Sequence, residues 1–374
     1  MTRHAFVFIE VFGCEGGIQS YIQDVLGAYD QVAPQLNATA DVFLLRDSKN
    51  DHALKGGNLK YHYLKNSRAM VERGHLTAAL ALYLLRHRPD HVFCGHINLV
   101  SMVSLLCRLL KIPYTVLTYG KEVWYELPIA EKKALSAADS IVSISRYSRD
   151  LACEANQIAP EKFTMLPCVV DGTAFTPGAD DPTWVERYQL QGAKVLMTVA
   201  RLWPGDIYKG VDVTIRALPQ IAEAFPSVKY VVIGRGDDQP RLAKLATELG
   251  VADRVVFAGF VPDEALVAHY RLADVYVMPS KEGFGIVYLE AMACGVPVIA
   301  GDDDGSADPL QDGRLGWQVP HRDADAVAIA CIEALGGDDP RCDGAWLRSQ
   351  ALARFSPPAL VSQVSQLLDK LATH

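Results

Sequence analysis

The chain has 374 residues, of which 50% are hydrophobic and 21% charged, with 36 Lys and Arg against 44 Asp and Glu and a net charge of −8. The hydrophobic fraction excludes a disordered chain, and the acidic balance argues against nucleic acid as a partner. A single compact core rarely reaches this length, so we expect two domains.

Short hydrophobic runs rich in β-branched residues recur along the chain, with helical patterns between them. In the first half they are residues 5–9, 41–45, 59–63, 91–94, 114–117, 140–144 and 163–166. In the second half they are residues 195–200, 229–233, 254–258, 274–278, 297–300 and 317–319. Because the runs are continuous rather than alternating, they predict parallel strands buried on both faces, with helices on each side of the sheet.

The densest cluster of turn residues lies near residues 168–193 and interrupts this strand–helix repetition. The pattern therefore predicts an α/β protein with two Rossmann-like domains, residues 1–175 and 176–355. Residues 356–374 form a separate terminal segment, in which an amphipathic helix follows a Ser-Pro-Pro sequence.

Eight scattered cysteines form no CxxC or zinc-binding spacing, which indicates reduced core thiols in a cytoplasmic protein. No segment reaches the roughly 18 hydrophobic residues that a membrane span requires. The best candidate, residues 97–110, is interrupted by Asn98 and Arg108 and is predicted to be a core helix.

A glycine motif and a basic motif each follow a predicted strand, at the position where folds of this kind bind their ligands. Gly16 and Gly17 follow the first strand and allow helix N–H groups to approach a phosphate or a sugar, although a tight turn requires glycine equally. Arg201 and Lys209 follow the first strand of the second half and suit a diphosphate, the alternative being ordinary solvated loop residues.

The strongest motif spans residues 279–300, which pass from a strand end through a glycine-rich loop into a helix and a second strand. Glu282 falls in the loop and Glu290 on the helix. One carboxylate can bind sugar hydroxyls and the other a ribose, with phosphates over the helix N-terminus between them. The alternative for Glu290 is a solvated helix face, which the hydrophobic residues around it argue against.

Together these residues resemble retaining glycosyltransferases of family 4, and the resemblance covers nearly the whole chain. It rests on Gly16-Gly17, Arg201, Lys209, the Gly-Arg-Gly-Asp run 234–237 and the E-x7-E motif 282–290 with its Glu-Gly-Phe-Gly start. The resemblance implies the GT-B fold, in which two Rossmann-like domains face each other across a cleft. It also implies that the C-terminal helix crosses back to the first domain.

In this family the second domain holds a nucleoside-diphosphate sugar. The resemblance implies that Arg201 and Lys209 contact the diphosphate and that Glu282 contacts the sugar. The implied donor-binding residues are Gly16, Gly17, Gly234, Phe260, Val261, Phe284, Gly285, Ile286 and Glu290. Among them, Glu290 would contact the ribose, Phe260 and Val261 would lie beside the base, and residues 284–286 would act through their backbone.

The sequence departs from the family pattern at Tyr119, where many relatives have a His near the transferred sugar. Tyr119 is a fourth catalytic candidate because its hydroxyl can donate a hydrogen bond there, the alternative being a residue that only packs. The Asp run 302–304 would hold a metal in the unrelated GT-A fold, but here we expect a loop that contacts the acceptor or the donor. Since Arg201 and Lys209 supply cations for the diphosphate, we expect no obligatory metal or other cofactor.

A narrower likeness is to bacterial α-mannosyltransferases of the xanthan and acetan type. It favours GDP-mannose as donor, with a UDP-sugar next, and a saccharide or polyprenyl-diphosphate-linked acceptor in polysaccharide or glycoconjugate biosynthesis. No carboxylate is placed as a nucleophile, so we expect Arg201, Lys209 and helix N–H groups to stabilise the leaving diphosphate.

Residues 46–88 carry nine Lys and Arg against three Asp and Glu, a local charge of +6. This stretch either draws the protein to an anionic membrane surface or forms an ordinary solvated face. We expect a cytoplasmic protein, peripheral on the inner face of the membrane if the first reading holds. Two other functions stay open, a GT-B nucleotide-sugar epimerase and a catalytically silent binding subunit.

Overall fold

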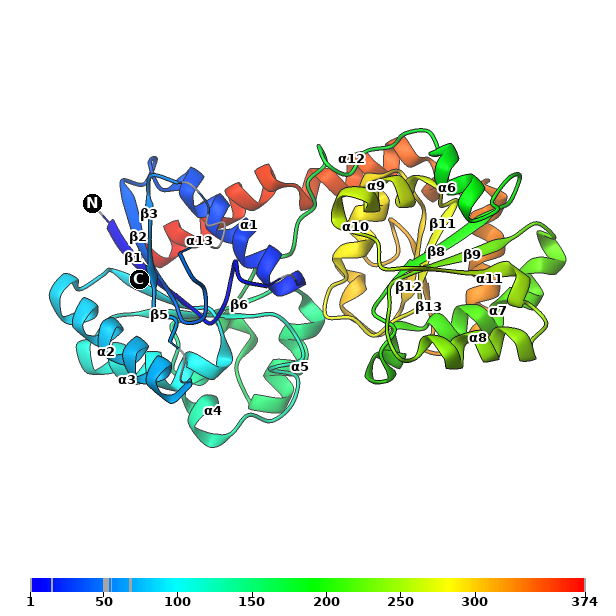
Figure 1. The fold of residues 1–374 in the computed structure, drawn as a ribbon. Helices are drawn as coiled ribbons and strands as arrows, with labels where there is room; N and C mark the ends of the chain where they lie inside the picture. The colour runs from blue at the N-terminus through cyan, green and yellow to red at the C-terminus, as the bar shows by residue number, and fades with distance from the viewer. Residues whose placement is uncertain (1, 15, 50–53, 55, 67–68, 373–374) are drawn as a thin grey trace. The chain divides into compact units, whose positions relative to one another are not determined.

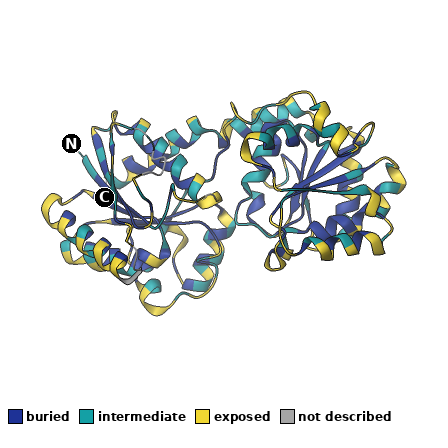
Figure 2. Cartoon of the chain, in the orientation of Figure 1, coloured by how far each residue is buried: buried dark blue, intermediate teal, exposed yellow. Residues whose placement is uncertain are grey.

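The computed structural model describes residues 2–14, 16–49, 54, 56–66 and 69–372. The chain divides into unit 1, Met1–Val169 with Pro357–His374, and unit 2, Val170–Ser356. The break near residue 170 lies a few residues before the boundary expected at 175. Each unit is an open sheet covered by helices, with dark blue strands inside and exposed residues on the outer helices (Figures 1 and 2).

Unit 1 is built on a parallel seven-stranded sheet in the order β3-β2-β1-β4-β5-β6-β7. Its strands are β1 (Thr2–Phe8), β2 (Ala38–Leu44), β3 (Leu59–Tyr63), β4 (His91–Cys94), β5 (Tyr114–Thr118), β6 (Ser140–Ser143) and β7 (Phe163–Met165). Its helices are α1 (Gly17–Val32), α2 (Ala69–His87), α3 (Ile97–Leu110), α4 (Ile129–Ser136), α5 (Arg146–Asn156) and α13 (Pro357–Ala372). The terminal helix α13 packs against α1, as expected for a helix that returns to the first domain.

Unit 2 is built on a parallel six-stranded sheet in the order β10-β9-β8-β11-β12-β13. Its strands are β8 (Val195–Val199), β9 (Lys229–Ile233), β10 (Val255–Gly259), β11 (Val275–Met278), β12 (Val298–Gly301) and β13 (Trp317–Val319). Its helices are α6 (Pro182–Arg187), α7 (Val211–Ala224), α8 (Gln239–Glu248), α9 (Asp263–Arg271), α10 (Ile286–Ala293), α11 (Ala324–Gly336) and α12 (Gly344–Phe355).

The predicted α/β class and every predicted strand are confirmed, with ends that differ by at most three residues. The largest differences are at β1 and β2, which begin at Thr2 and Ala38, each three residues before its hydrophobic run. The polar start of β1 pairs in register with β2, and His4 is buried there in a hydrogen bond with the Tyr29 hydroxyl at 2.8 Å. Because histidine counts as a polar residue, the hydrophobic pattern does not include His4, and the predicted strand therefore begins too late.

The predicted core helix 97–110 is confirmed as α3, whose N-terminus is capped by the His96 side chain. Among the described residues, no helix is long and hydrophobic enough to cross a membrane. All eight cysteines fall within the described ranges and none is in a disulfide. Cys14 is exposed, whereas the other seven are buried or partly buried.

Each sheet has one topological switch point, where the strand order reverses beside the first strand. In unit 1 it lies between β1 and β4, and in unit 2 between β8 and β11. Open parallel sheets bind ligands in the crevice outside the carboxyl ends of the strands at this point. The residues that follow these four strands are therefore the ones that the fold presents to a ligand.

Candidate active site

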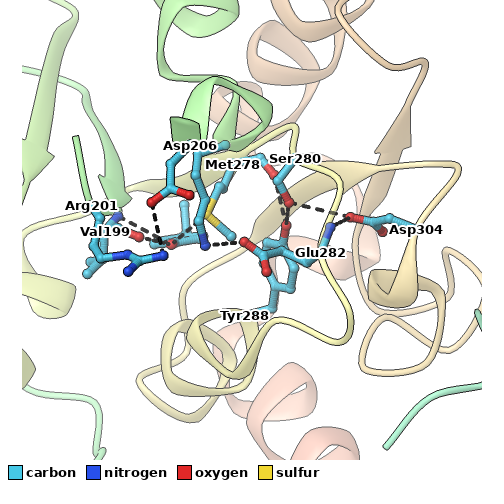
Figure 3. A network of polar contacts seen from close by, with 10 residues as sticks. Val199, Arg201, Asp206, Met278, Ser280, Glu282, Tyr288 and Asp304 are labelled. Carbon is cyan, nitrogen blue, oxygen red and sulfur yellow. Dashed lines mark hydrogen bonds and ion pairs between the residues drawn. The ribbon is translucent and has the colours of Figure 1, made fainter. Parts of the chain in front are cut away.

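The carboxyl ends of β8, β9, β11 and β12 bring most of the predicted site residues together in unit 2. Figure 3 shows the central network, in which Arg201 follows β8, Glu282 follows β11 and Asp304 follows β12. Lys209 ends a short 3-10 helix, Pro204–Lys209, and Gly210 in the left-handed region lets α7 begin immediately after it. The loops thus surround the switch point of unit 2.

Lys209 and Glu282, both predicted from the sequence, form an ion pair in which the ammonium donates to the carboxylate. The two side chains are 19% and 17% exposed, so solvent and a ligand reach them. A phosphate oxygen is a strong acceptor for an ammonium group, and a carboxylate is a strong acceptor for sugar hydroxyls. The ion pair can therefore separate when a sugar phosphate binds, because Lys209 can then donate to the phosphate and Glu282 can accept from the sugar hydroxyls.

Arg201 lies beside Asp206, with 3.0 Å between a guanidinium nitrogen and a carboxylate oxygen. Asp206 is buried, whereas the Arg201 side chain is 76% exposed. An ion pair with one such exposed partner contributes little free energy, so Arg201 can turn to an incoming phosphate at small cost. Until a phosphate binds, the ion pair with Asp206 holds the Arg201 guanidinium at the site.

The loop that follows β12 supports the loop that carries Glu282 through hydrogen bonds. Asp304 is buried and accepts hydrogen bonds from the backbone N–H groups of Glu282 (Figure 3) and of Ser306, each at 2.8 Å. The Gly305 N–H donates to the Glu282 carbonyl at 2.8 Å, and a Cβ at Gly305 would meet the Gly283 carbonyl oxygen at 2.0 Å. Burial is the main cause that raises the pKa of Asp304 to about 6.

The Asp run 302–304 does not form one site. Asp304 points inward, Asp303 forms an ion pair with Lys281 at 3.0 Å, and Asp302 is exposed. Among the residues that the structure describes, no three His, Cys, Asp or Glu side chains are grouped as around a metal ion. The expected contact of this run with a ligand thus gives way to a supporting role for Asp304.

Glu290 lies on the second turn of α10, partly buried, and accepts a hydrogen bond from the Tyr270 hydroxyl at 2.6 Å. Burial raises the pKa of Glu290 to about 7, an effect that the Tyr270 hydrogen bond opposes and that Asp263 reinforces. The predicted inward position of Glu290 is confirmed, because α10 is largely buried around it. Since Glu282 lies in the loop before α10, a helical spacing applies only from residue 286 onward.

An open cavity of about 680 Å³ lies beside Arg201 and is also lined by Trp203 and Arg235. Trp203 and Phe260 are 58% and 56% exposed, and the Arg235 guanidinium lies 4.7 Å from the centroid of the Phe260 ring. Exposed aromatic rings of this kind offer a stacking surface to a nucleobase. Gly234 permits the close approach of strands here, because its φ is +134° and a Cβ would meet the Ala200 carbonyl oxygen at 1.8 Å.

The remaining predicted residues of unit 2 are Val261, Phe284, Gly285 and Ile286. Val261 is buried, and the Phe284 ring packs edge-on against Phe355. Gly285 adopts a φ of +86° and precedes Ile286, the first residue of α10. α10 therefore begins directly after the loop that holds Glu282, with no side chain capping its first N–H groups, and such a helix start can bind an anion.

Gly16, Gly17 and Tyr119 belong to unit 1. Gly16 precedes α1, and Gly17 is its first residue. Tyr119 is buried, and its hydroxyl donates to the Gly95 carbonyl at 2.7 Å. Because this hydroxyl proton is already used within unit 1, the structure favours the packing alternative for Tyr119.

Sequence reasoning missed several residues of the site: Trp203, Asp206, Tyr270, Ser280 and Tyr288. Trp203 carries a signal, since an aromatic residue in a polar loop after a strand is unusual. Asp206 carries a weaker one, an acidic residue between two predicted phosphate-binding cations. Tyr270 comes from another helix, and the Ser280 to Tyr288 hydrogen bond of 2.8 Å depends on how α10 folds back, so no local pattern marks them.

Comparisons with known proteins agree with this geometry. The model of a family described as "Glycosyl transferases group 1" matches residues 193–336. A GDP-mannose-dependent alpha-(1-6)-phosphatidylinositol monomannoside mannosyltransferase of Mycolicibacterium smegmatis is 32% identical over 342 residues, which cover 87% of each chain. A D-inositol 3-phosphate glycosyltransferase of Acidothermus cellulolyticus is 31% identical over 243 residues, which cover 60% of this chain and 52% of that one.

Among solved structures, the crystal structure of Anabaena HepE in complex with UDP has a TM-score of 0.78 and covers 99% of this chain and all of the other. At 18% sequence identity, this likeness shows the fold alone.

Proposed function

Because the chain belongs to the group 1 glycosyltransferases, we propose that it transfers mannose from GDP-mannose to a saccharide or lipid-linked acceptor in glycoconjugate biosynthesis. The observation that carries the proposal is the pairing of Lys209 with Glu282 next to Arg201, at the switch point of unit 2. These groups supply two cations for a diphosphate and one carboxylate for sugar hydroxyls. The choice of GDP-mannose follows the Mycolicibacterium relative, and a UDP-sugar is the next candidate.

The proposed chemistry is transfer with retention of the anomeric configuration, as in family 4. The bond between the sugar C1 and the diphosphate oxygen breaks, and its electron pair leaves with the diphosphate. The acceptor oxygen bonds to C1 from the same face, and its proton passes to a diphosphate oxygen. Arg201, Lys209 and the first N–H groups of α10 stabilise the charge that develops there, while Glu282 orients the sugar.

Two cationic side chains and a helix N-terminus take the place that a divalent metal has in other diphosphate sites. We therefore propose that no metal is obligatory. Activity that persists in excess EDTA supports this, and activity that is abolished by EDTA and restored by Mg²⁺ or Mn²⁺ contradicts it.

The donor proposal is tested by incubating the protein with GDP-mannose or UDP-sugars, with and without a phosphatidylinositol mannoside acceptor. A glycosylated acceptor supports the transferase. A changed sugar nucleotide without acceptor indicates the epimerase, and nucleotide binding without turnover indicates the silent subunit. A thermal-shift panel of GDP, UDP and ADP identifies the base, because a ligand raises stability by RT ln(1 + [L]/Kd).

The residue roles are tested in the same assay by Arg201→Ala and Lys209→Ala. Each should lower turnover by roughly a hundredfold, since each removes a charge-assisted contact to the leaving diphosphate. Lys244→Ala is the matched control, because Lys244 is a 78% exposed lysine on α8 of the same unit. Turnover within a few-fold of wild type for both site variants contradicts the proposed mechanism.

For the acceptor, the compounds after which the two relatives are named share an inositol group that bears a phosphate. The xanthan- and acetan-type acceptors expected from the narrower likeness also bear phosphate, as a polyprenyl diphosphate. We propose that the acceptor of this protein carries a phosphate group, with phosphatidylinositol mannosides ahead of polyprenyl-diphosphate saccharides. Parallel assays with the two acceptor types decide between them.

A membrane-bound acceptor is consistent with a surface on unit 1 that we propose to contact anionic lipid. Helices α2 and α3 lie against each other, and their outer residues form the α2–α3 face. Its exposed side chains are Leu82, Leu85, Leu105 and Leu109 with Arg86, Arg88, Arg108 and Lys111. Leucines that enter a lipid surface and basic residues that meet its anionic headgroups act together, each basic residue contributing about 1 kcal/mol.

The basic stretch 46–88 is thus divided by the fold. Arg86 and Arg88 lie at the C-terminal end of α2, whereas Arg46 follows β2 and Arg73 lies near the start of α2. Lys55 and Arg68 lie outside the described residues. Only the far end of α2 therefore joins the proposed membrane surface.

Sedimentation with phosphatidylcholine vesicles, with and without an anionic lipid, tests this contact. We expect binding to anionic vesicles that Leu105→Glu with Leu109→Glu weakens. Ile329→Glu, at a 60% exposed position on α11 of unit 2, is the matched control and should change nothing. Equal binding to neutral and anionic vesicles at low salt contradicts the proposal.

A further inference from the structure

Unit 2 begins with the entry segment, residues 170–176, which directly follows the first part of unit 1. The Val170 N–H donates to the carbonyl of Phe355, the last residue of α12, at 2.9 Å. One residue later, after Ser356, the chain leaves unit 2 and forms α13. The incoming and the outgoing parts of the chain are therefore tied to each other within unit 2.

One face of α12 holds the entry segment. Arg348, Leu352 and Phe355 are spaced by four and three residues, which places them on the same face of the helix. The Arg348 guanidinium donates to the carbonyl oxygens of Gly172 at 2.5 Å and of Phe175 at 2.6 Å. A Cβ at Gly172 would meet a methyl carbon of Leu352 at 2.7 Å, so the entry segment lies directly against this face.

The same face of α12 contacts the helix α10 near both of its ends. At the C-terminal end, Arg348 also donates to the carbonyl of Ala293, one of the last-turn carbonyls that lack a partner within a helix. Before the N-terminal end, the Phe284 ring packs edge-on against the Phe355 ring, with the centroids 5.8 Å apart. A ligand that restrains α10 therefore also restrains the face of α12 that holds the entry segment.

A second connection runs through Glu290 on α10. The Tyr270 hydroxyl donates to Glu290 at 2.6 Å, and the Phe175 ring packs edge-on against the Tyr270 ring, with the centroids 5.9 Å apart. The next residue of α9, Arg271, donates to the carbonyl and the hydroxyl of Thr176 at 2.8 and 2.7 Å. The entry segment thus contacts the side chain that supports Glu290 as well as the arginine that holds the end of α10.

We infer that Arg348 is a positioning residue that couples α10 to the entry segment, so that a nucleoside diphosphate bound at α10 stabilises residues 170–176. Its guanidinium holds three carbonyl oxygens from two separate segments, because its N–H groups point outward in a fixed planar fork. A glutamine amide or a lysine ammonium group does not reproduce this fork. The inference rests on the proposed function, since it takes α10 as part of the donor site.

Hydrogen exchange of the full chain, with and without saturating GDP, tests the coupling without requiring transfer. The reporters are the N–H groups of residues 173–175, each of which donates to Asp171. We expect GDP to slow their exchange in wild type by about fivefold or more, the lower end of the coupling between two sites. In Arg348→Gln, GDP should still slow exchange in the loop 282–286 but should leave the reporters unchanged. Arg216→Gln, at an exposed position on α7 of the same unit, is the matched control and should behave as wild type.

The ratio of exchange rates with and without GDP separates coupling from a merely structural role, which would speed exchange equally in both conditions. Arg348→Lys keeps the charge without the fork, so it should also lose most of the GDP effect, and it serves as the test if Arg348→Gln fails to fold. An equal ratio in wild type and the Arg348 variants overturns the inference, as does protection by GDP of the loop 282–286 alone in wild type. Absence of GDP binding in calorimetry overturns the proposed donor instead, and coupling by GDP without transfer from any nucleotide sugar overturns the transferase while supporting the role of Arg348.

Discussion

Replacing Glu290 with Gln removes a partly buried carboxyl group but keeps an oxygen that accepts the hydrogen bond from Tyr270. Burial raises the pKa of Glu290 from 4.5 to about 7. Between these values the folded chain binds more protons than the unfolded chain, so this group makes the free energy of unfolding fall as pH rises. The penalty is complete above pH 7, where the carboxylate is ionised in both states.

The magnitude follows from the shift. At about 1.4 kcal/mol per pKa unit, a shift from 4.5 to about 7 corresponds to about 3 kcal/mol. Because solvent reaches part of the side chain, we expect roughly 1–3 kcal/mol. Glu290→Gln should therefore gain this much stability relative to wild type between pH 5 and pH 8, while losing affinity for GDP.

Urea unfolding at pH 5, 6, 7 and 8, followed by tryptophan fluorescence, measures the effect. The signal reports mainly on unit 2, which holds four of the five tryptophans: Trp184, Trp203, Trp317 and Trp346. Glu264→Gln, at an exposed position on α9, is the matched control and should show a difference from wild type that does not change with pH. The reasoning is wrong if the stability difference for Glu290→Gln is the same at pH 5 and pH 8.

Three further predictions concern single contacts. Lys209→Met should weaken GDP binding by roughly tenfold in calorimetry, through loss of a charge-assisted contact; unchanged affinity would remove Lys209 from the diphosphate site. Asp304→Asn replaces one of the two carboxylate oxygens that accept backbone N–H groups by an amide group that cannot accept them. It should lower kcat several-fold with little change in nucleotide affinity, and an unaltered kcat would contradict the supporting role. Tyr119→Phe should cost about 1 kcal/mol in urea unfolding through the lost bond to Gly95 while kcat/KM stays within about twofold, and a large loss of kcat/KM would restore its catalytic candidacy.

The fold could be predicted because its signals are local. A run such as residues 229–233 is hydrophobic after its first residue, Lys229, and it forms the inner strand β9 with the predicted ends. The pattern does not give the strand order. That order decides which strand ends meet, and therefore why Arg201 after β8 lies near Glu282 after β11, more than seventy residues later.

The site could be predicted in part. Arg201, Lys209, Glu282 and Glu290 sit in motifs that mark them without a structure. Tyr270 and the supporting role of Asp304 could not be found, because each acts by holding a residue that is distant in the sequence.

The basic stretch 46–88 shows the opposite case, because residues that are close together in the sequence are separated in space. Arg73 and Arg86 lie on one helix, 13 residues apart, which at about 1.5 Å per residue separates their backbones by roughly 20 Å. The end of α2 that carries Arg86 therefore contributes to the α2–α3 face, and the end that carries Arg73 does not.

The placement of α13 bears on how the protein is made. Unit 1 contains the first segment of the chain and also α13, whose Val364, Leu367 and Leu368 cover Phe6 and Tyr29. On the ribosome, unit 2 is synthesised between these two parts, which at about 5–20 residues per second takes roughly 10 to 40 s. During that time the hydrophobic surface beneath α13 is bare, so nascent unit 1 is a substrate for chaperones until the last helix emerges.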